Sequence, residues 1–147
     1  MNDIQLKRTT RIGFSDSYVD GEIKKCEYNT DFYDIIIDGN SLYSTFENYD
    51  YISVLGQINE DLQKNEIKKL LLESPSELRA GQYFIFVCPM CADLGCGAIT
   101  VSIKREEEYI IWADFRSENH ETSQSLNMGP YKFLWKDYLR IISSADL

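Results

Sequence analysis

Three of the four cysteines lie within nine positions, in the segment of the chain that offers the most distinctive chemistry. Cys88 and Cys91 form a CxxC pair, and Cys96 follows after a turn that contains Gly95. Because glycine permits tight turns, we expect this segment to bring the three sulfurs close together. Thiolates in such an arrangement bind metal ions or exchange with disulfides, so the segment predicts a metal or thiol-redox site centred on Cys88, Cys91 and Cys96.

A zinc site at this segment requires a fourth ligand, since structural zinc is bound by four groups in a tetrahedron. The chain offers Cys26, Asp93 and its single histidine, His120. An iron–sulfur cluster has the same requirement, and the chain contains no second CxxC pair. Zinc is therefore the alternative cofactor, and otherwise we expect none.

Two other interpretations of the cysteines stay open. In a redox site, Cys88 and Cys91 would be the reactive pair, although Gly95 and Gly97 lead into another strand rather than into the helix that usually follows such a pair. Alternatively, the cysteines are small, buried and inert thiols that shape a turn between two central strands.

Around these cysteines the chain resembles a family of small bacterial proteins with three sequence motifs, CPxCGDLGCGAVT, VVWxDF and GPFxFD. The matching segments are residues 88–100, 110–115 and 129–134, so the resemblance covers roughly the carboxy-terminal half. The chain departs from these motifs at Ala92, where they have glycine, and at Leu134, where they tend to have an acid. The resemblance carries no established activity, and it therefore implies no catalytic residue.

The amino-terminal half of the chain interleaves acidic and aromatic residues. Tyrosines anchor many protein interfaces, and carboxylates steer a basic partner, so this composition suits binding to a basic protein. The alternative is a polar sheet face beside core aromatics. The residues predicted to contact a partner are Asp16, Asp20, Asp31, Asp34, Asp50, Tyr33, Tyr43 and Tyr49.

The net charge of −9 and the pI near 4.6 argue against nucleic acid as a partner, because that affinity comes from lysine and arginine. No apolar stretch approaches the roughly 20 residues of a membrane span, and the amino terminus lacks the apolar core of a secretion signal. We therefore expect a cytoplasmic protein. The sequence also shows no nucleophile elbow, phosphate-binding glycine loop or paired-histidine motif, so we do not expect an enzyme.

At 147 residues the chain fits a single domain, residues 1–147. Its patterns predict an α+β fold, with a mostly antiparallel sheet, a central helix at about 57–73 and a short carboxy-terminal helix at about 135–143. The expected strands include two hairpins, 33–37 with 42–46 and 99–104 with 109–115, and a buried central strand, 83–87. Short antiparallel strands are expected between residues 11 and 46, with a turn at Asp20 and Gly21. Leu62 is expected on the inner face of the central helix. Residues 116–128 read as a surface loop.

These observations favour a non-enzymatic acidic domain that binds a basic protein. The specific hypothesis is an immunity or antitoxin-like protein that neutralises a bacterial toxin, such as a nuclease, by covering its active surface. The competing hypothesis is the zinc or thiol-redox protein described above. The sequence leaves the oligomeric state open.

Overall fold

The fold of the chain is α+β with antiparallel sheets, as the sequence predicts. The computed structural model describes residues 1–56, 60–76, 78–79, 81–88 and 97–145, and only the backbone of residues 14–17, 19 and 26–28. The elements in chain order are β1 (Ile4–Val19), β2 (Glu22–Ile37), β3 (Asn40–Ser41), α1 (Leu42–Thr45), the 3-10 turn η1 (Glu47–Tyr49), β4 (Ile52–Ser53), α2 (Glu60–Leu70), β5 (Gln82–Val87), β6 (Ala98–Glu106), β7 (Tyr109–Glu118), β8 (Ser123–Ser125), β9 (Tyr131–Leu134) and α3 (Trp135–Ser143).

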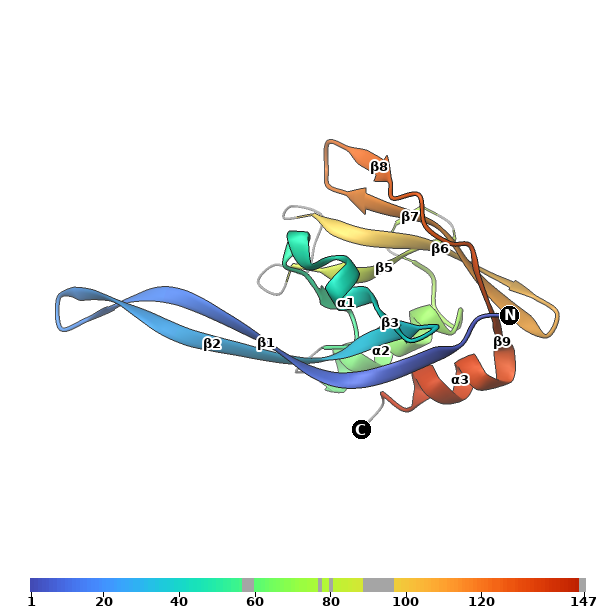
Figure 1. Ribbon diagram of the computed structural model, residues 1–147, viewed down its shortest axis with the longest axis horizontal. Coiled ribbons are helices and arrows are strands. Elements are labelled where there is room, and N and C mark those ends of the chain that lie inside the picture. The colour runs from blue at the N-terminus through green and yellow to red at the C-terminus, as the bar shows by residue number, and fades with distance from the viewer. Residues whose placement is uncertain (57–59, 77, 80, 89–96, 146–147) are drawn as a thin grey trace.

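A long hairpin formed by β1 and β2 dominates the outline of the molecule. The two strands pair over 16 residues each, from Ile4 opposite Ile37 to Val19 opposite Glu22. Asp20 and Gly21 make the turn with φ values of 53° and 78°, the left-handed conformations that a two-residue hairpin turn requires. Figure 1 shows the inner half of the hairpin crossing the body and the outer half projecting from it. The predicted turn is confirmed, but the strands are much longer than the short strands expected.

The second sheet has the order β4-β5-β6-β7-β8, and β9 also pairs with β7. Strand β5, which lies between β4 and β6, is an almost unbroken run of buried residues, which confirms the buried strand predicted from its continuous apolar sequence. The hairpin of β6 and β7 is also confirmed. This sheet supplies most of the hydrophobic core, and the inner half of the β1–β2 hairpin contributes Ile4, Ile35 and Ile37 to the same core.

The carboxy-terminal helix α3 begins and ends where the sequence predicts. It buries Tyr138, Ile141 and Ile142, and the Tyr138 ring stacks on Phe133 at 6.0 Å and meets Trp112 edge-on, also at 6.0 Å. The central helix α2 is also present, although residues 57–59 of its predicted range lie outside the described part of the chain. Among the helices that the structure describes, none is long and apolar enough to cross a membrane.

Three predicted details of the fold are wrong. Residues 42–46 do not form the second strand of a hairpin, because the Ser41 side chain accepts a hydrogen bond from the Ser44 backbone N–H and caps helix α1 instead. The predicted surface loop at 116–128 contains the end of β7 and strand β8. Leu62, expected on the inner face of the central helix, is 52% exposed, and Gln63 is buried there.

Candidate protein-binding site

The candidate site lies where the projecting hairpin leaves the body, and it joins residues from distant parts of the chain. We call Arg11, Tyr43, Tyr49, Asp50 and Tyr51 the arm-base cluster. Arg11 Nε donates to Asp50 Oδ1 at 2.8 Å and Arg11 Nη2 donates to Asp50 Oδ2 at 2.5 Å, across 39 residues of sequence. This two-point ion pair fixes the middle of the hairpin to the segment that follows η1.

The two charges of this pair differ in their access to solvent. The Arg11 side chain is 14% exposed and that of Asp50 is 65% exposed. The hydrogen bond from Arg11 lowers the pKa of Asp50, and the same hydrogen bond raises the pKa of Arg11. Asp50 is therefore a solvent-facing carboxylate that stays ionised at neutral pH and has free acceptor capacity on its outer side.

Two stacked tyrosines flank Asp50 in the sequence. The rings of Tyr49 and Tyr51 have centroids 5.5 Å apart and an interplanar angle of 18°, and Tyr49 remains 38% exposed. Burial raises the pKa of Tyr51, and the neighbouring Cys88 and Tyr49 raise it further. Burial and the nearby Asp50 likewise raise the pKa of Tyr43. These hydroxyls therefore remain protonated at neutral pH, so they can act as hydrogen-bond donors.

The cluster adjoins the ends of the strands that flank the cysteine segment. Val87 pairs with Ala98, so Cys88 and Gly97 leave β5 and β6 at the same edge of the sheet. Gly97 has a φ of 94°, and a Cβ atom at this position would clash with the Tyr51 hydroxyl. Glycine is thus required here by both the backbone conformation and the packing of Tyr51.

The predicted metal site lies largely outside the described residues. Cys91, Asp93 and Cys96 lie outside the described residues, and the side chain of Cys26 is not described either. Cys88 is a half-buried free thiol, and His120 is exposed. Within the described part of the chain, no three His, Cys, Asp or Glu side chains are grouped to hold a metal. The zinc or thiol-redox site therefore stays a prediction.

The predicted partner-binding residues separate into distinct locations. Tyr43, Tyr49 and Asp50 belong to the arm-base cluster. Asp31 and Tyr33 point to the opposite face of β2 from Phe32, the residue on which Tyr43 packs at 4.9 Å, because successive strand residues alternate faces.

On that opposite face, Asp31 accepts a hydrogen bond from Thr10 at 2.6 Å, and the Arg8 guanidinium lies 5.1 Å from the Tyr33 ring centroid. Asp20 is exposed at the hairpin turn, and the side chain of Asp16 lies outside the described part of the structure. The sequence analysis therefore assigned these residues to one interface, but the fold places them on two faces of the hairpin.

Asp34 is a correction to the predicted set. It is 4% exposed, and its carboxylate accepts hydrogen bonds from the Ser41 hydroxyl and from the Tyr43 backbone N–H. This carboxylate holds helix α1 against β2, so it is not accessible to a partner. We remove Asp34 from the proposed binding surface.

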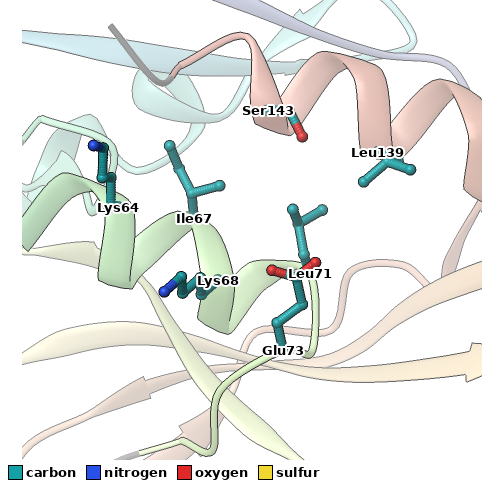
Figure 2. A pocket seen from close by; sticks show the side chains of 7 residues that line it. All are labelled: Lys64, Ile67, Lys68, Leu71, Glu73, Leu139 and Ser143. Carbon is teal, nitrogen blue, oxygen red and sulfur yellow. The ribbon is translucent and has the colours of Figure 1, made fainter.

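Sequence reasoning missed Arg11 and two exposed apolar residues of the hairpin, Ile12 and Ile23. No local pattern marks Arg11, because its partner Asp50 is brought to it only by the tertiary fold. A second feature without a sequence signal is a hollow of about 250 Å³ between α2 and α3, shown in Figure 2. Its lining residues are Lys64, Ile67, Lys68, Leu71, Glu73, Leu139 and Ser143, none of which belongs to the predicted sites.

Comparisons of the chain with protein-family models, with curated proteins and with solved structures found no match. The resemblance to the small bacterial family with the CPxCGDLGCGAVT motif accordingly stays a prediction.

The arm-base cluster is suited to binding a cation rather than to covalent chemistry. The ionised Asp50 carboxylate can bind a lysine or arginine side chain through an ion pair, and the exposed Tyr49 ring can bind one through a cation–π contact. Arg11 already occupies one side of Asp50, which orients the carboxylate before a partner arrives. Such preorganisation reduces the entropy cost of binding.

Proposed function

We propose that this chain is a non-enzymatic binding protein of the immunity or antitoxin type, and that it neutralises a basic bacterial toxin by covering the toxin's active surface. The observation that carries the proposal is the exposed Asp50 carboxylate, which Arg11 orients and which the stacked Tyr49 and Tyr51 flank in the sequence. A nuclease active surface holds cationic groups that bind phosphate, and a carboxylate can occupy these groups in place of the substrate.

The overall charge supports the proposal in a second way. The net charge of −9 attracts a cationic partner and raises the association rate of the two proteins, with the largest effect at low salt. Asp20 and Asp31 are exposed along the hairpin and add to this attraction. Both the protein and its target would meet in the cytoplasm before the toxin damages the cell.

The proposal is tested by co-expressing this chain with the toxin candidate encoded by the neighbouring gene, in a bacterium that the toxin kills when it is expressed alone. We expect the unaltered chain to restore growth and to purify as a complex with its partner. Tyr49→Ala is expected to weaken binding about tenfold or more, because truncation of an interface tyrosine at a hot spot costs more than 1 kcal/mol. Tyr49 is partly exposed, so this variant should fold normally.

Glu108→Gln is the control for charge, since Glu108 is exposed on the β6–β7 turn, at the opposite end of the body from the projecting β1–β2 hairpin (Figure 1). Cys91→Ser separates the competing zinc or thiol hypothesis, which predicts loss of folding or activity in that variant. Binding by occlusion predicts almost unchanged protection. Absence of both a complex and protection with the unaltered chain would rule out the proposed function.

A further inference from the structure

The hollow between α2 and α3 has the size of a site for a small molecule. Its volume is about 250 Å³. A cavity of roughly 150 Å³ already holds benzene, and drug-sized ligands occupy sites of roughly 300 Å³ or more, so the hollow suits a ligand between these two sizes. None of its lining residues belongs to the arm-base cluster, so what the hollow binds does not depend on the proposed function.

The floor of the hollow is apolar. Ile67 and Leu71 lie one helical turn apart on α2, and each is 6% exposed. Leu139 lines the hollow from α3 and is 37% exposed (Figure 2). Covering a solvent-exposed aliphatic side chain with another apolar group is favourable, because it removes apolar surface from water. The floor therefore suits a short aliphatic chain.

The lining of the hollow contains more bases than acids, although the whole chain has a net charge of −9. The exposed residues Lys64 and Lys68, one turn apart on α2, line it together with a single acid, Glu73. Figure 2 shows the two amino groups at one end of the hollow and the Glu73 carboxylate nearer the other end. A basic end beside an apolar floor complements a ligand that has an anionic head and an apolar tail.

We infer that the hollow binds a small aliphatic carboxylate, with its chain on the apolar floor and its carboxylate at Lys68. Lys64 already pairs with Glu60 at 3.3 Å, whereas the Lys68 amino group makes no ion pair or hydrogen bond within the described part of the chain. The Ser143 hydroxyl lines the hollow from α3 and can donate a second hydrogen bond to an anion. One available lysine and one hydroxyl suit the single charge of a carboxylate better than a phosphate group, which carries about −1.5 to −2 at pH 7.

Titration of the isotope-labelled full chain with octanoate, followed by the NMR shifts of its backbone amides, tests this inference. We expect the amides of α2 and α3 beside the hollow to shift together, with a dissociation constant of about 0.1–1 mM. Lys68→Gln should weaken octanoate binding about threefold, and Leu139→Ser should weaken it about fivefold. The matched controls Lys136→Gln and Leu62→Ser change an exposed lysine of α3 and an exposed leucine of α2 that do not line the hollow. Each control should leave the dissociation constant within about 1.5-fold of that of the unaltered chain.

Two related ligands separate the contributions of the charge and of the chain. Octylammonium has the same chain and the opposite charge, and it should bind at least about fivefold more weakly than octanoate; acetate, which lacks the chain, should give no saturable shift. Equal binding of octanoate and octylammonium overturns the assignment of an anion, and no shift beside the hollow at about 10 mM octanoate overturns the site. Binding of an acidic leucine-containing peptide without binding of octanoate would assign the hollow to a protein segment instead. None of these measurements involves the toxin, so this inference and the proposed function can fail separately.

Discussion

Glu118→Ala is expected to lower the free energy of unfolding by about 2–4 kcal/mol at pH 7, because it removes the common acceptor of a buried polar network. Glu118 is 6% exposed. Its carboxylate accepts hydrogen bonds from Arg79 at 2.7 Å, Ser123 at 2.8 Å and Thr100 at 2.5 Å. The substitution leaves a cavity and a fully buried Thr100 hydroxyl that has lost its acceptor. Urea unfolding at pH 7 measures this loss.

The same network gives the stability a defined dependence on pH. Burial on its own would raise the pKa of Glu118, and the hydrogen bonds from Thr100, Ser123 and Arg79 outweigh it and hold the pKa below its ordinary value. A carboxyl group whose pKa is lowered by folding stabilises the protein above its unfolded pKa, near 4.5, and this contribution is lost as the pH falls through the folded pKa.

This pH dependence separates the charge of Glu118 from its volume. Glu118→Gln keeps the shape of the side chain, so its deficit relative to the unaltered chain should be largest at neutral pH and should shrink as the pH falls below about 4.5. Glu108→Gln, on an exposed turn, should show almost no deficit at either pH. A Glu118→Gln deficit that is constant from pH 7 to pH 3.5 would contradict the role assigned to the ionised carboxylate.

Tyr138→Phe is expected to cost about 2–4 kcal/mol, although it removes a single oxygen atom. The Tyr138 hydroxyl is fully buried, donates to the Leu70 carbonyl at 2.5 Å and accepts from Trp112 Nε1 at 3.3 Å. Burial raises the pKa of Tyr138 far above its ordinary value, so the hydroxyl stays a donor at every pH at which the protein folds. The phenylalanine variant leaves both partners without this hydrogen bond inside the core.

Tyr83→Phe is the matched control for this prediction. Tyr83 is also buried, at 8% exposure, and its hydroxyl makes no hydrogen bond to another residue in the described part of the chain. We therefore expect Tyr83→Phe to change the free energy of unfolding by less than about 0.5 kcal/mol. Equal effects of the two substitutions in thermal or urea unfolding would show that the Tyr138 hydroxyl does not link α3 to α2 and β7 as described.

The sequence predicted those elements whose apolar pattern is strong and local. The continuous apolar run of β5, the alternation in β6 and the helical spacing of Trp135, Tyr138 and Ile142 each gave the correct element. It failed at residues 42–46, where the Ser41 cap favours a helix over a strand of similar composition. It also failed to predict the length of the β1–β2 hairpin, because Thr9, Thr10 and Ser15 are polar residues without a core-facing pattern.

The candidate site was predicted less completely, for a physical reason. Residue types identified Tyr43, Tyr49 and Asp50, but their grouping with Arg11 depends on an ion pair across 39 residues. The sequence alone does not show whether a carboxylate faces solvent or accepts hydrogen bonds from groups of the same chain. Asp34 was therefore mistaken for a surface acid, although the fold uses it internally.

The most direct test of the central claim is a calorimetric titration of the isolated partner with the unaltered chain, with Asp50→Asn and with Glu108→Gln. Asparagine can still accept a hydrogen bond from Arg11, so the first variant removes the charge while largely keeping the local geometry. We predict that Asp50→Asn weakens binding at least about tenfold, or about 1.4 kcal/mol, and that Glu108→Gln changes it less than about twofold. Equal affinities for all three proteins would contradict the claim that the arm-base cluster binds the partner.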